Sequence, residues 1–456
     1  MDPTTLTIAS ARASLDASEI TARDLTDTCL QQIERLNPKL NAFISVFHDV
    51  VASGAEQSPL FGIPLAVKDL YDLAGHATTA GTTFFREQIA ERDAAAVERL
   101  KANGAVIVGK TSTHEIAYGV TGVNPHFGAC HNPWDTTRIP GGSSSGSAVA
   151  VATGMCLGAL GTDTGGSIRI PSALCGVVGL KPTFGRVSLR GVFPLSWNLD
   201  HAGPIARTVR DAAILLQAIA GYDPLDPGSA DKPMEDYLLD IEGGVRSWRV
   251  AVAAGDYFED LDPEVATAYA EAVSVFSDLG AELTSLDLSF VREATLANGQ
   301  MIGADAAAFH RERLEVNPAG FGADVRQRLE IGARLSGKEY ALARRAQSEM
   351  RRRMEMFFTQ YDILLTPTVP IPAPLIEGAD ALEQARRLTR FTAPFNLTGL
   401  PALSLPCGFT SGRLPVGLQI VSRPWGEAKV LRAAQAYEGV TSWHDRHPPG
   451  LSDQTH

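Results

Sequence analysis

The chain has 456 residues, and its 40 lysines and arginines against 52 aspartates and glutamates give a formal net charge of −12. This charge has the wrong sign for a protein whose main partner is nucleic acid or an anionic membrane. The longest apolar run, residues 148–160, is shorter than the roughly 20 residues that span a bilayer. The five cysteines are scattered without a C-x-x-C pair, which fits reduced thiols, so we expect a soluble, cytoplasmic protein.

The N-terminal part alternates helical and strand patterns. Thr21 is placed to cap a helix that Pro38 ends, and the β-rich run 41–47 follows it. Asp93 is placed to cap a second helix that closes at Gly104. This alternation is typical of an α/β fold.

A lysine ends the apolar strand predicted between residues 60 and 69. Ile63, Leu65 and Val67 share one face of this strand, because side chains alternate between faces, and Lys68 therefore lies on the other. A lysine in such apolar surroundings has two interpretations. It forms an ion pair with Asp69 or another acid, or it is kept neutral by burial and acts as a base.

The rest of the chain continues the same alternation. We expect a linker-like segment at 222–233 and a loosely held polar tail from His444 onward. The predicted elements are helices at 146–156, 171–175 and 208–220, a β-α-β unit over 248–288, a helical region at 291–358, strands at 362–365, 402–406 and 417–421, and a last helix at 428–437.

Two glycine-and-serine loops, at 140–147 and 161–169, flank the apolar run. Such loops bring backbone N–H groups close to a bound atom, because glycine has no Cβ to obstruct the approach. By themselves they suit a phosphate cradle, a serine nucleophile with an oxyanion hole, or a pair of tight turns.

Several short motifs compete for the functional interpretation. Residues 104–111, GAVIVGKT, match the phosphate-loop pattern, but a helix precedes them and their centre is itself a strand pattern. Residues 142–146, GSSSG, match the nucleophile elbow with Ser144 at its centre, but no hydrophobic strand leads into them. Residues 229–232 match S-x-x-K inside the linker-like segment. His126, Cys130 and His131 lack a fourth partner at metal-ligand spacing, so no metal site is predicted.

The chain resembles the amidase signature family in a series of blocks that follow the family's order. Ser145 and the pair Thr113-His114 depart from the pattern, since the family more often has Gly and Met-Asp there. The matching blocks are GIPLAVKD at 62–69, PGGSS at 140–144, DTGGSIRIP at 163–171, GVVGLKPT at 176–183, PFNLTGLP at 394–401 and GLQ at 417–419.

The resemblance implies a Ser-Ser-Lys mechanism. Lys68 is then the base, Ser143 relays the proton from within a cis peptide, and Ser167 attacks the carbonyl carbon to form an acyl-enzyme. The resemblance also implies an oxyanion hole made by the backbone N–H groups of Thr164, Gly165, Gly166 and Ser167. Asp163 and Arg169 are expected to hold this loop by ion pairing.

The resemblance also implies a fold and a substrate side. We expect a single α/β domain over 1–456 whose mixed sheet is covered by helices on both faces. Its core is expected at about 20–220 and 360–440, and a variable helical region at about 290–358 is expected to shape the entrance. The segment Ala117, Tyr118 and Gly119 is expected beside the acyl group.

The predicted function is hydrolysis of a small-molecule amide, or of a related ester or carbamate, by a monomer or homodimer without a metal or organic cofactor. One alternative keeps the chemistry and adds a partner: the glutamine-hydrolysing, A-type component of an aminoacyl-tRNA amidotransferase. An alternative of another class is a nucleotide-binding module built on residues 104–111.

Overall fold

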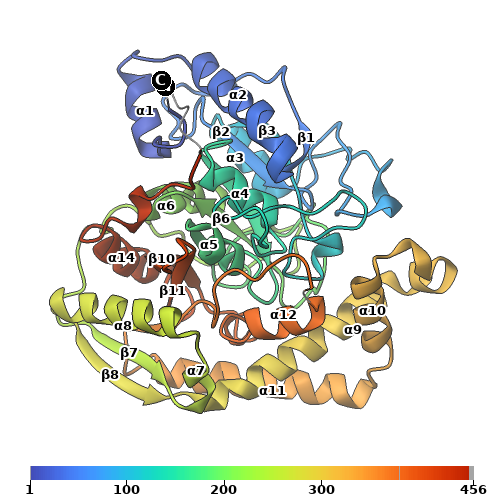
Figure 1. Ribbon diagram of the computed structural model, residues 1–456, viewed down its shortest axis with the longest axis vertical. Coiled ribbons are helices and arrows are strands. Elements are labelled where there is room, and N and C mark those ends of the chain that lie inside the picture. The colour runs from blue at the N-terminus through green and yellow to red at the C-terminus, as the bar shows by residue number, and fades with distance from the viewer. Residues whose placement is uncertain (1, 379, 451–456) are drawn as a thin grey trace.

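A mixed sheet of 11 strands runs through the part of the chain that the computed structural model describes, residues 2–378 and 380–450 (Figure 1). The strands are parallel in the β3-β2-β4 and β9-β7-β8 neighbourhoods and antiparallel elsewhere. Their order across the sheet is β1 (Phe43–Val46), β3 (Val106–Thr111), β2 (Pro64–Lys68), β4 (Gly158–Asp163), β6 (His201–Ala206), β5 (Val178–Lys181), β10 (Ala402–Phe409), β11 (Pro415–Val421), β9 (Ile363–Pro367), β7 (Arg249–Ala254) and β8 (Glu282–Asp287).

Helices cover both faces of the sheet, as predicted. None of the helices within residues 2–378 and 380–450 is both long enough and apolar enough to cross a membrane. They are α1 (Ile8–Asp16), α2 (Ala22–Leu40), α3 (Ala95–Ala102), α4 (Ser145–Ala152), α5 (Arg169–Cys175), α6 (Val209–Ile219), α7 (Asp256–Glu259), α8 (Pro263–Asp278), α9 (Arg292–Val316), α10 (Ala323–Ala333), α11 (Gly337–Phe357), α12 (Ala381–Leu388), α13 (Ala393–Leu397) and α14 (Glu427–Glu438).

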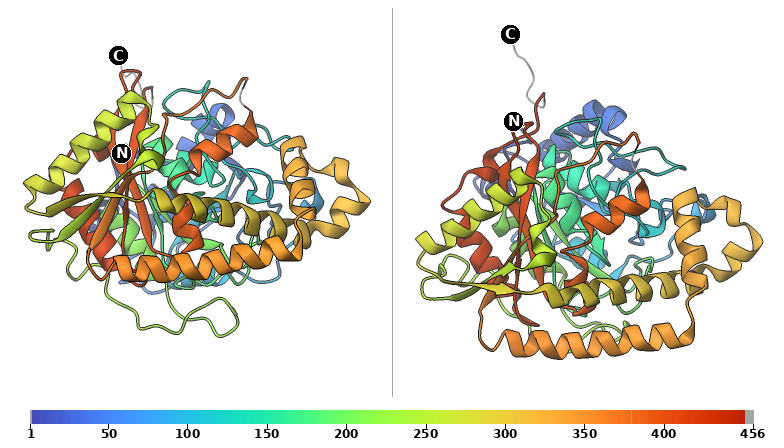
Figure 2. Two further views of the ribbon diagram at one scale, coloured as in Figure 1. Left: turned by 90° about the horizontal axis from the view of Figure 1, so that it is seen from below. Right: turned by 60° about the horizontal axis from the view of Figure 1, so that its bottom comes forward.

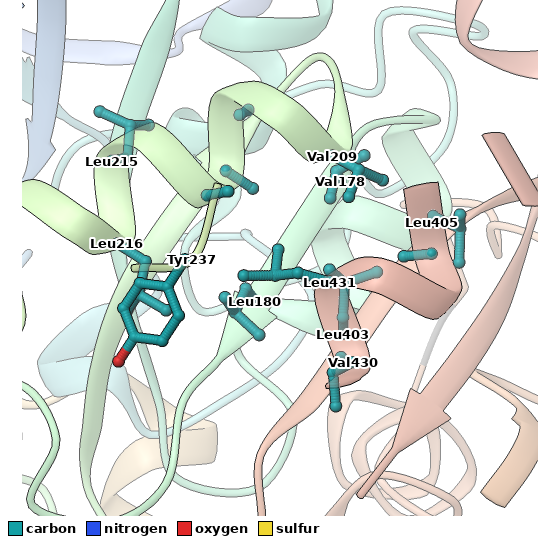
Figure 3. Packing of buried hydrophobic residues seen from close by; sticks show 14 of the residues in the cluster. Val178, Leu180, Val209, Leu215, Leu216, Tyr237, Leu403, Leu405, Val430 and Leu431 are labelled. Atoms are coloured by element: carbon teal, nitrogen blue, oxygen red, sulfur yellow. The ribbon is translucent and has the colours of Figure 1, made fainter. Parts of the chain in front are cut away.

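Strand alternation sorts the core into two layers. Leu65 and Val67 of β2 pack into a cluster with α3, α6, α8 and α14, whereas Ala66 packs on the opposite face against α4. Figure 3 shows the first layer, where leucines of β5 and β10 meet side chains of α6 and α14. Lys68 therefore lies on the face opposite Leu65 and Val67, as strand alternation predicted, and shares the α4 face with Ala66.

The predicted β-α-β unit is present as β7, α8 and β8. β7 and β8 pair in parallel, and β7 also pairs with β9, so this unit extends the same sheet beyond the predicted core ranges. On the other face, α9, α11 and α13 cover β7, β9 and β11. Figure 2 shows α11 running alongside α9, with α10 at the end of this pair.

Three predicted boundaries were wrong. Pro38 does not end α2, because the helix continues for two more residues and stops at Asn41, which adopts the left-handed conformation with φ of 50°. Asp93 does not cap α3, because its carboxylate accepts from Ala74 N and pairs with Lys101. α4 ends at Ala152 instead of continuing to residue 156.

The polar tail is partly held in place. Trp443–Asp445 forms a 3-10 turn, and Arg207 lies 3.1 Å from His447 Nδ1. The last part of the predicted loose tail, residues 451–456, lies outside the described residues.

Candidate active site

Lys68 is in contact with two hydroxyl groups from distant parts of the sequence. Its Nζ lies 2.7 Å from Ser143 Oγ and 2.8 Å from Thr162 Oγ1. Ser143 stands just before α4, and Thr162 belongs to β4, which pairs in parallel with β2. The sheet register and the α4 packing thus bring together three groups that are 75 and 94 positions apart in the sequence.

Lys68 is fully buried, and no carboxylate of the described residues is in contact with it. Burial lowers the pKa of its ammonium to about 7, and the more distant charges of Asp163 and Asp200 oppose this shift in part. The ion pair with Asp69 that the sequence left open does not form. Asp69 pairs instead with Lys110 at 2.8 Å, so Lys68 is poised to lose its proton near neutral pH.

The loop before α4 presents Ser143 and turns Ser144 away. The peptide between Gly142 and Ser143 is cis. Ser144 is fully buried, and its Oγ lies 3.2 Å from both the backbone N and the backbone O of Thr162. Because this hydroxyl is committed to the β4 backbone, the nucleophile elbow centred on Ser144 is not formed.

Ser167 opens onto a cavity next to this loop. Its side chain is 5% exposed, and its Oγ has no hydrogen-bond partner among the described residues. Ser144 N donates to the Ser167 carbonyl at 3.2 Å, which ties the two glycine-and-serine loops together. Ser143 and Ser167 are therefore held on neighbouring segments, with Ser167 on the cavity side.

Side chains hold the backbone carbonyls of the loop that leads to Ser167. A trans peptide points its N–H opposite to its C=O, so a bond to each carbonyl also fixes the direction of the next residue's N–H. The bonds run from His201 Nδ1 and Asn396 Nδ2 to Asp163 O (3.1 and 3.0 Å), from Asn298 Nδ2 to Thr164 O (3.3 Å) and from Thr392 Oγ1 to Gly165 O (2.6 Å).

The four N–H groups predicted for the oxyanion hole are not equivalent. Gly166 N donates to Asp163 Oδ1 at 2.8 Å and is thus engaged within the protein. The N–H groups of Thr164, Gly165 and Ser167 have no acceptor among the described residues. These three, all on residues that line the cavity, remain available to an anion.

Asp163 and Arg169 form the buried frame of this loop, as expected. Their side chains are fully buried and lie 2.9 Å apart. Burial opposes ionisation of Asp163, but the charges of Arg169 and Lys181 and the hydrogen bonds from Arg169 and Asn396 together outweigh it and keep the pKa of this carboxyl below its ordinary value. Arg169 also donates to Gln419 Oε1 at 2.7 Å and Asn396 Oδ1 at 2.6 Å, so it links the loop to β11 and α13.

A second buried carboxylate holds the Thr164 side chain. Thr164 Oγ1 donates to Asp200 Oδ1 at 2.7 Å, and the other Asp200 oxygen accepts from Leu195 N and Ser196 N at 2.8 and 3.0 Å. Burial raises the pKa of Asp200 to about 6, against these hydrogen bonds. Asp200 thus anchors the Thr164 end of the loop, and it has no basic partner in contact within the described part of the chain.

The segment predicted beside the acyl group lies at the cavity wall. Ala117, Tyr118 and Gly119 all line the cavity. A Cβ on Gly119 would stand 2.1 Å from His114 Nε2, a nitrogen that contacts Asp324 Oδ2 at 3.0 Å. The His114 that departs from the family pattern therefore ties this segment to α10.

The cavity has a volume of about 440 Å³ and mostly apolar walls. Its charged lining residues are Arg328 and Arg386, and no described lining residue is an aspartate or glutamate. The lining residues are Ala117, Tyr118, Gly119, Val120, Thr164, Gly165, Ser167, Leu195, Thr295, Leu296, Asn298, Gly299, Gln300, Ile302, Gly303, Arg328, Ile331, Gly332, Leu335, Leu382, Ala385, Arg386, Thr389 and Ala393.

The competing motifs do not form sites. The phosphate-loop match lies largely in β3, and Lys110 of this motif is buried against Asp69 and Thr78. His126 contacts Glu115, and His131 contacts the Thr136 carbonyl. Within the described residues, no group of three His, Cys, Asp or Glu side chains is arranged to hold a metal ion.

Sequence reasoning missed four residues of this site: Thr162, Asp200, Asn298 and Arg328. Thr162 had a usable signal, because strand alternation predicts that its side chain points to the face of β4 opposite that of Asp163. Asn298 and Arg328 had none, because they lie in long polar helices where spacing does not tell which polar side chain faces a cavity.

The chain is similar to known proteins over nearly its whole length. A family model described as Amidase matches residues 24–431. An amidase of Pseudomonas putida is 42% identical, and the alignment covers 98% of this chain and 98% of the relative. The A-type chain of the glutamyl-tRNA(Gln) amidotransferase of Roseiflexus sp. is 39% identical, with 97% of this chain and 98% of the relative covered.

A solved structure extends the similarity to the whole fold. The structure of 6-aminohexanoate cyclic dimer hydrolase superposes with a TM-score of 0.90 at 30% sequence identity. The superposition covers 99% of this chain and 100% of the hydrolase chain.

Proposed function

The chain belongs to the amidase signature family and is a hydrolase of carbon–nitrogen bonds other than peptide bonds, and we propose that Lys68, Ser143 and Ser167 carry out its reaction. The observation that carries this proposal is the 2.7 Å contact between a buried Lys68 and Ser143 Oγ, beside a cavity that Ser167 lines. A neutral amine in contact with a hydroxyl can act as a general base.

In the acylation step, Ser167 Oγ attacks the substrate carbonyl carbon. Its proton passes to Ser143 Oγ, and the Ser143 proton passes to the lone pair of neutral Lys68 Nζ. When the tetrahedral intermediate collapses, the carbon–nitrogen bond breaks and the same groups return a proton to the leaving nitrogen. The product of this step is an acyl-enzyme on Ser167 and a released amine.

The developing oxyanion is stabilised by the backbone of the nucleophile loop. Its donors are the N–H groups of Thr164, Gly165 and Ser167, which have no acceptor among the described residues. A preorganised donor of this kind contributes about 3–4 kcal/mol to the transition state. Water then attacks the acyl-enzyme, loses its proton along the same route, and regenerates Ser167.

The substrate proposed for this site is a small-molecule amide, with a related ester or carbamate accepted by the same chemistry. The chain is proposed to act as a monomer or homodimer, with residues 290–358 adapted to its substrate. The five described cysteines are all buried and unpaired, which supports a reducing, cytoplasmic compartment.

A second candidate function is glutamine hydrolysis in an amidotransferase, which the similarity to the Roseiflexus amidotransferase chain favours. Glutamine carries an α-ammonium group, and no described residue lining the cavity is a carboxylate that could pair with it. Purified chain is therefore expected to hydrolyse aryl or aliphatic amides without a partner and to leave glutamine nearly untouched. Partner-dependent glutaminase activity would instead favour the amidotransferase function.

Labelling with a serine-directed phosphonate tests the nucleophile. We expect the adduct on Ser167, and Ser167→Ala should lower kcat by about 10⁴- to 10⁶-fold and abolish labelling. Ser144→Ala is the matched control, because Ser144 is the neighbouring buried serine whose hydroxyl faces β4, and it should retain the adduct. An adduct on Ser144, or turnover that survives Ser167→Ala, would contradict the proposal.

A further inference from the structure

Asn298 of α9 stands out among the polar side chains that line the cavity. It is 2% exposed, and a Cβ built on Gly165 would lie 3.6 Å from its Nδ2. Asn298 therefore faces the loop that carries Ser167, at Gly165, which lies two residues before the proposed nucleophile. Ser167 and Asn298 line the same cavity.

The orientation of the Asn298 amide is fixed by its neighbour. Its Nδ2 donates to Thr164 O at 3.3 Å, and a carbonyl oxygen can only accept. The reverse orientation would place two acceptors against each other. The free end of the side chain is therefore Oδ1, a buried acceptor with no hydrogen-bond partner among the described residues.

Two other lining hydroxyls are already engaged within the protein. Thr389 Oγ1 donates to Ala385 O at 2.7 Å, and Thr295 Oγ1 lies 2.7 Å from Tyr257 Oη. Asn298 Oδ1 differs from them because nothing in the described protein satisfies it. Asn298 is one of the residues that line the cavity, and a buried acceptor without a protein donor is suited to a ligand donor.

We propose that Asn298 Oδ1 accepts a hydrogen bond from an N–H group of the scissile amide and so selects N–H amides over esters and N-alkylated amides. This inference rests on the proposed function, because it places the scissile bond at Ser167. An ester has no donor at the corresponding atom and would leave Oδ1 buried without a partner. Discrimination by such a bond amounts to about 10- to 100-fold in kcat/KM.

The test compares an aryl amide, its N-methyl derivative and the ester of the same acyl group. In the wild type, the N-methyl amide should be hydrolysed at least about tenfold less efficiently than the N–H amide. Asn298→Leu also removes the donor to Thr164 O, so it should lower kcat/KM for both substrates, and by about 10- to 100-fold more for the N–H amide than for the ester. The amide-to-ester ratio of kcat/KM is compared between Asn298→Leu and the wild type, because this comparison cancels the difference in intrinsic reactivity between the two substrates.

Asn298→Asp is the matched control, because it keeps an acceptor oxygen and loses the donor to Thr164 O. It should lower both substrates' kcat/KM together, whereas Asn298→Leu changes their ratio. Asn298→Ala serves if the leucine variant does not fold, and the wild-type comparison needs no variant. An equal loss for amide and ester in Asn298→Leu would overturn the inference in favour of a role through Thr164 alone.

Failure of this inference is distinguishable from failure of the proposed function. If Ser167→Ala abolishes hydrolysis of amide and ester alike while Asn298→Leu leaves their ratio unchanged, the nucleophile stands and the Asn298 inference is wrong. If Ser167→Ala leaves hydrolysis intact, the proposed function is wrong and the inference falls with it.

Discussion

Lys68 shows how one residue sets the pH range of the proposed reaction. The base must be neutral, and burial lowers the pKa of Lys68 to about 7. The neutral fraction therefore grows as pH rises through about 7 and falls about tenfold for each pH unit below it. We expect kcat/KM, measured from pH 5 to 9, to follow this rise and to reach a plateau above the Lys68 pKa.

Two observations sharpen this pH prediction. Protonation of Asp200, whose pKa burial raises to about 6, would weaken the hydrogen bonds that its oxygens accept from Thr164 Oγ1 and from Leu195 N and Ser196 N, and so steepen the fall below that pH. Lys68→Arg keeps the charge but cannot become neutral in this range, so it should be inactive at every pH. A flat profile between pH 5 and 8 would exclude Lys68 as the titrating base.

At the scale of the elements, the Asp163–Arg169 pair joins the nucleophile loop to the rest of the sheet. Arg169 bonds side chains from β4, α13 and β11, all of them buried. Arg169→Met would leave Asp163 as an unpaired buried charge. We expect the free energy of unfolding, measured in urea, to fall by about 3–5 kcal/mol.

The surface pair Arg345–Glu349 on α11 provides the control for that measurement. Both of its side chains are largely exposed, and Arg345→Met should change the free energy of unfolding by less than about 1 kcal/mol. The double variant Asp163→Asn, Arg169→Met should be less destabilised than Arg169→Met alone, because no uncompensated charge remains. If Arg169→Met and Arg345→Met lowered the free energy of unfolding equally, the stabilising role of the buried Asp163–Arg169 pair would be contradicted.

At the scale of the molecule, the cavity and the protein differ in charge. The chain has a net charge of −12, whereas the charged groups lining the cavity are Arg328 and Arg386. The guanidinium of Arg328 lies over the Tyr118 ring, with 5.7 Å to its centroid, and its Nε is buried without a partner among the described residues. An amide that carries a carboxylate should therefore bind better than its neutral isostere.

Arg328→Gln tests this preference with a pair of amides that differ only in that carboxylate. We expect KM for the anionic amide to rise about tenfold while KM for the neutral amide changes little. Arg386→Gln is the control, because Arg386 is exposed and its charge is screened. A parallel rise of KM for both amides would show that Arg328 shapes the cavity without recognising charge.

The sequence by itself determined the order of the elements, the family and the residues to consider for catalysis. Alternation in one short strand was enough to place Lys68 opposite Ile63, Leu65 and Val67, and the glycine-and-serine loops were local patterns in their own right. These features depend on neighbours along the chain, so they can be read from it. The same local reasoning missed where α2 and α4 end, because tertiary packing decides the last turn of a helix.

Only the tertiary structure decided which groups meet. Lys68 faces Ser143 and Thr162 instead of Asp69 because the β2–β4 register and the α4 packing bring those hydroxyls to it, while Lys110 takes the Asp69 carboxylate. Gly166 N–H donates to Asp163, and the bond from Asn298 Nδ2 to Thr164 O, across 134 positions, leaves Asn298 Oδ1 without a partner among the described residues. Partners so far apart in the chain leave no periodic trace in it, so the chemistry of the cavity wall follows from packing.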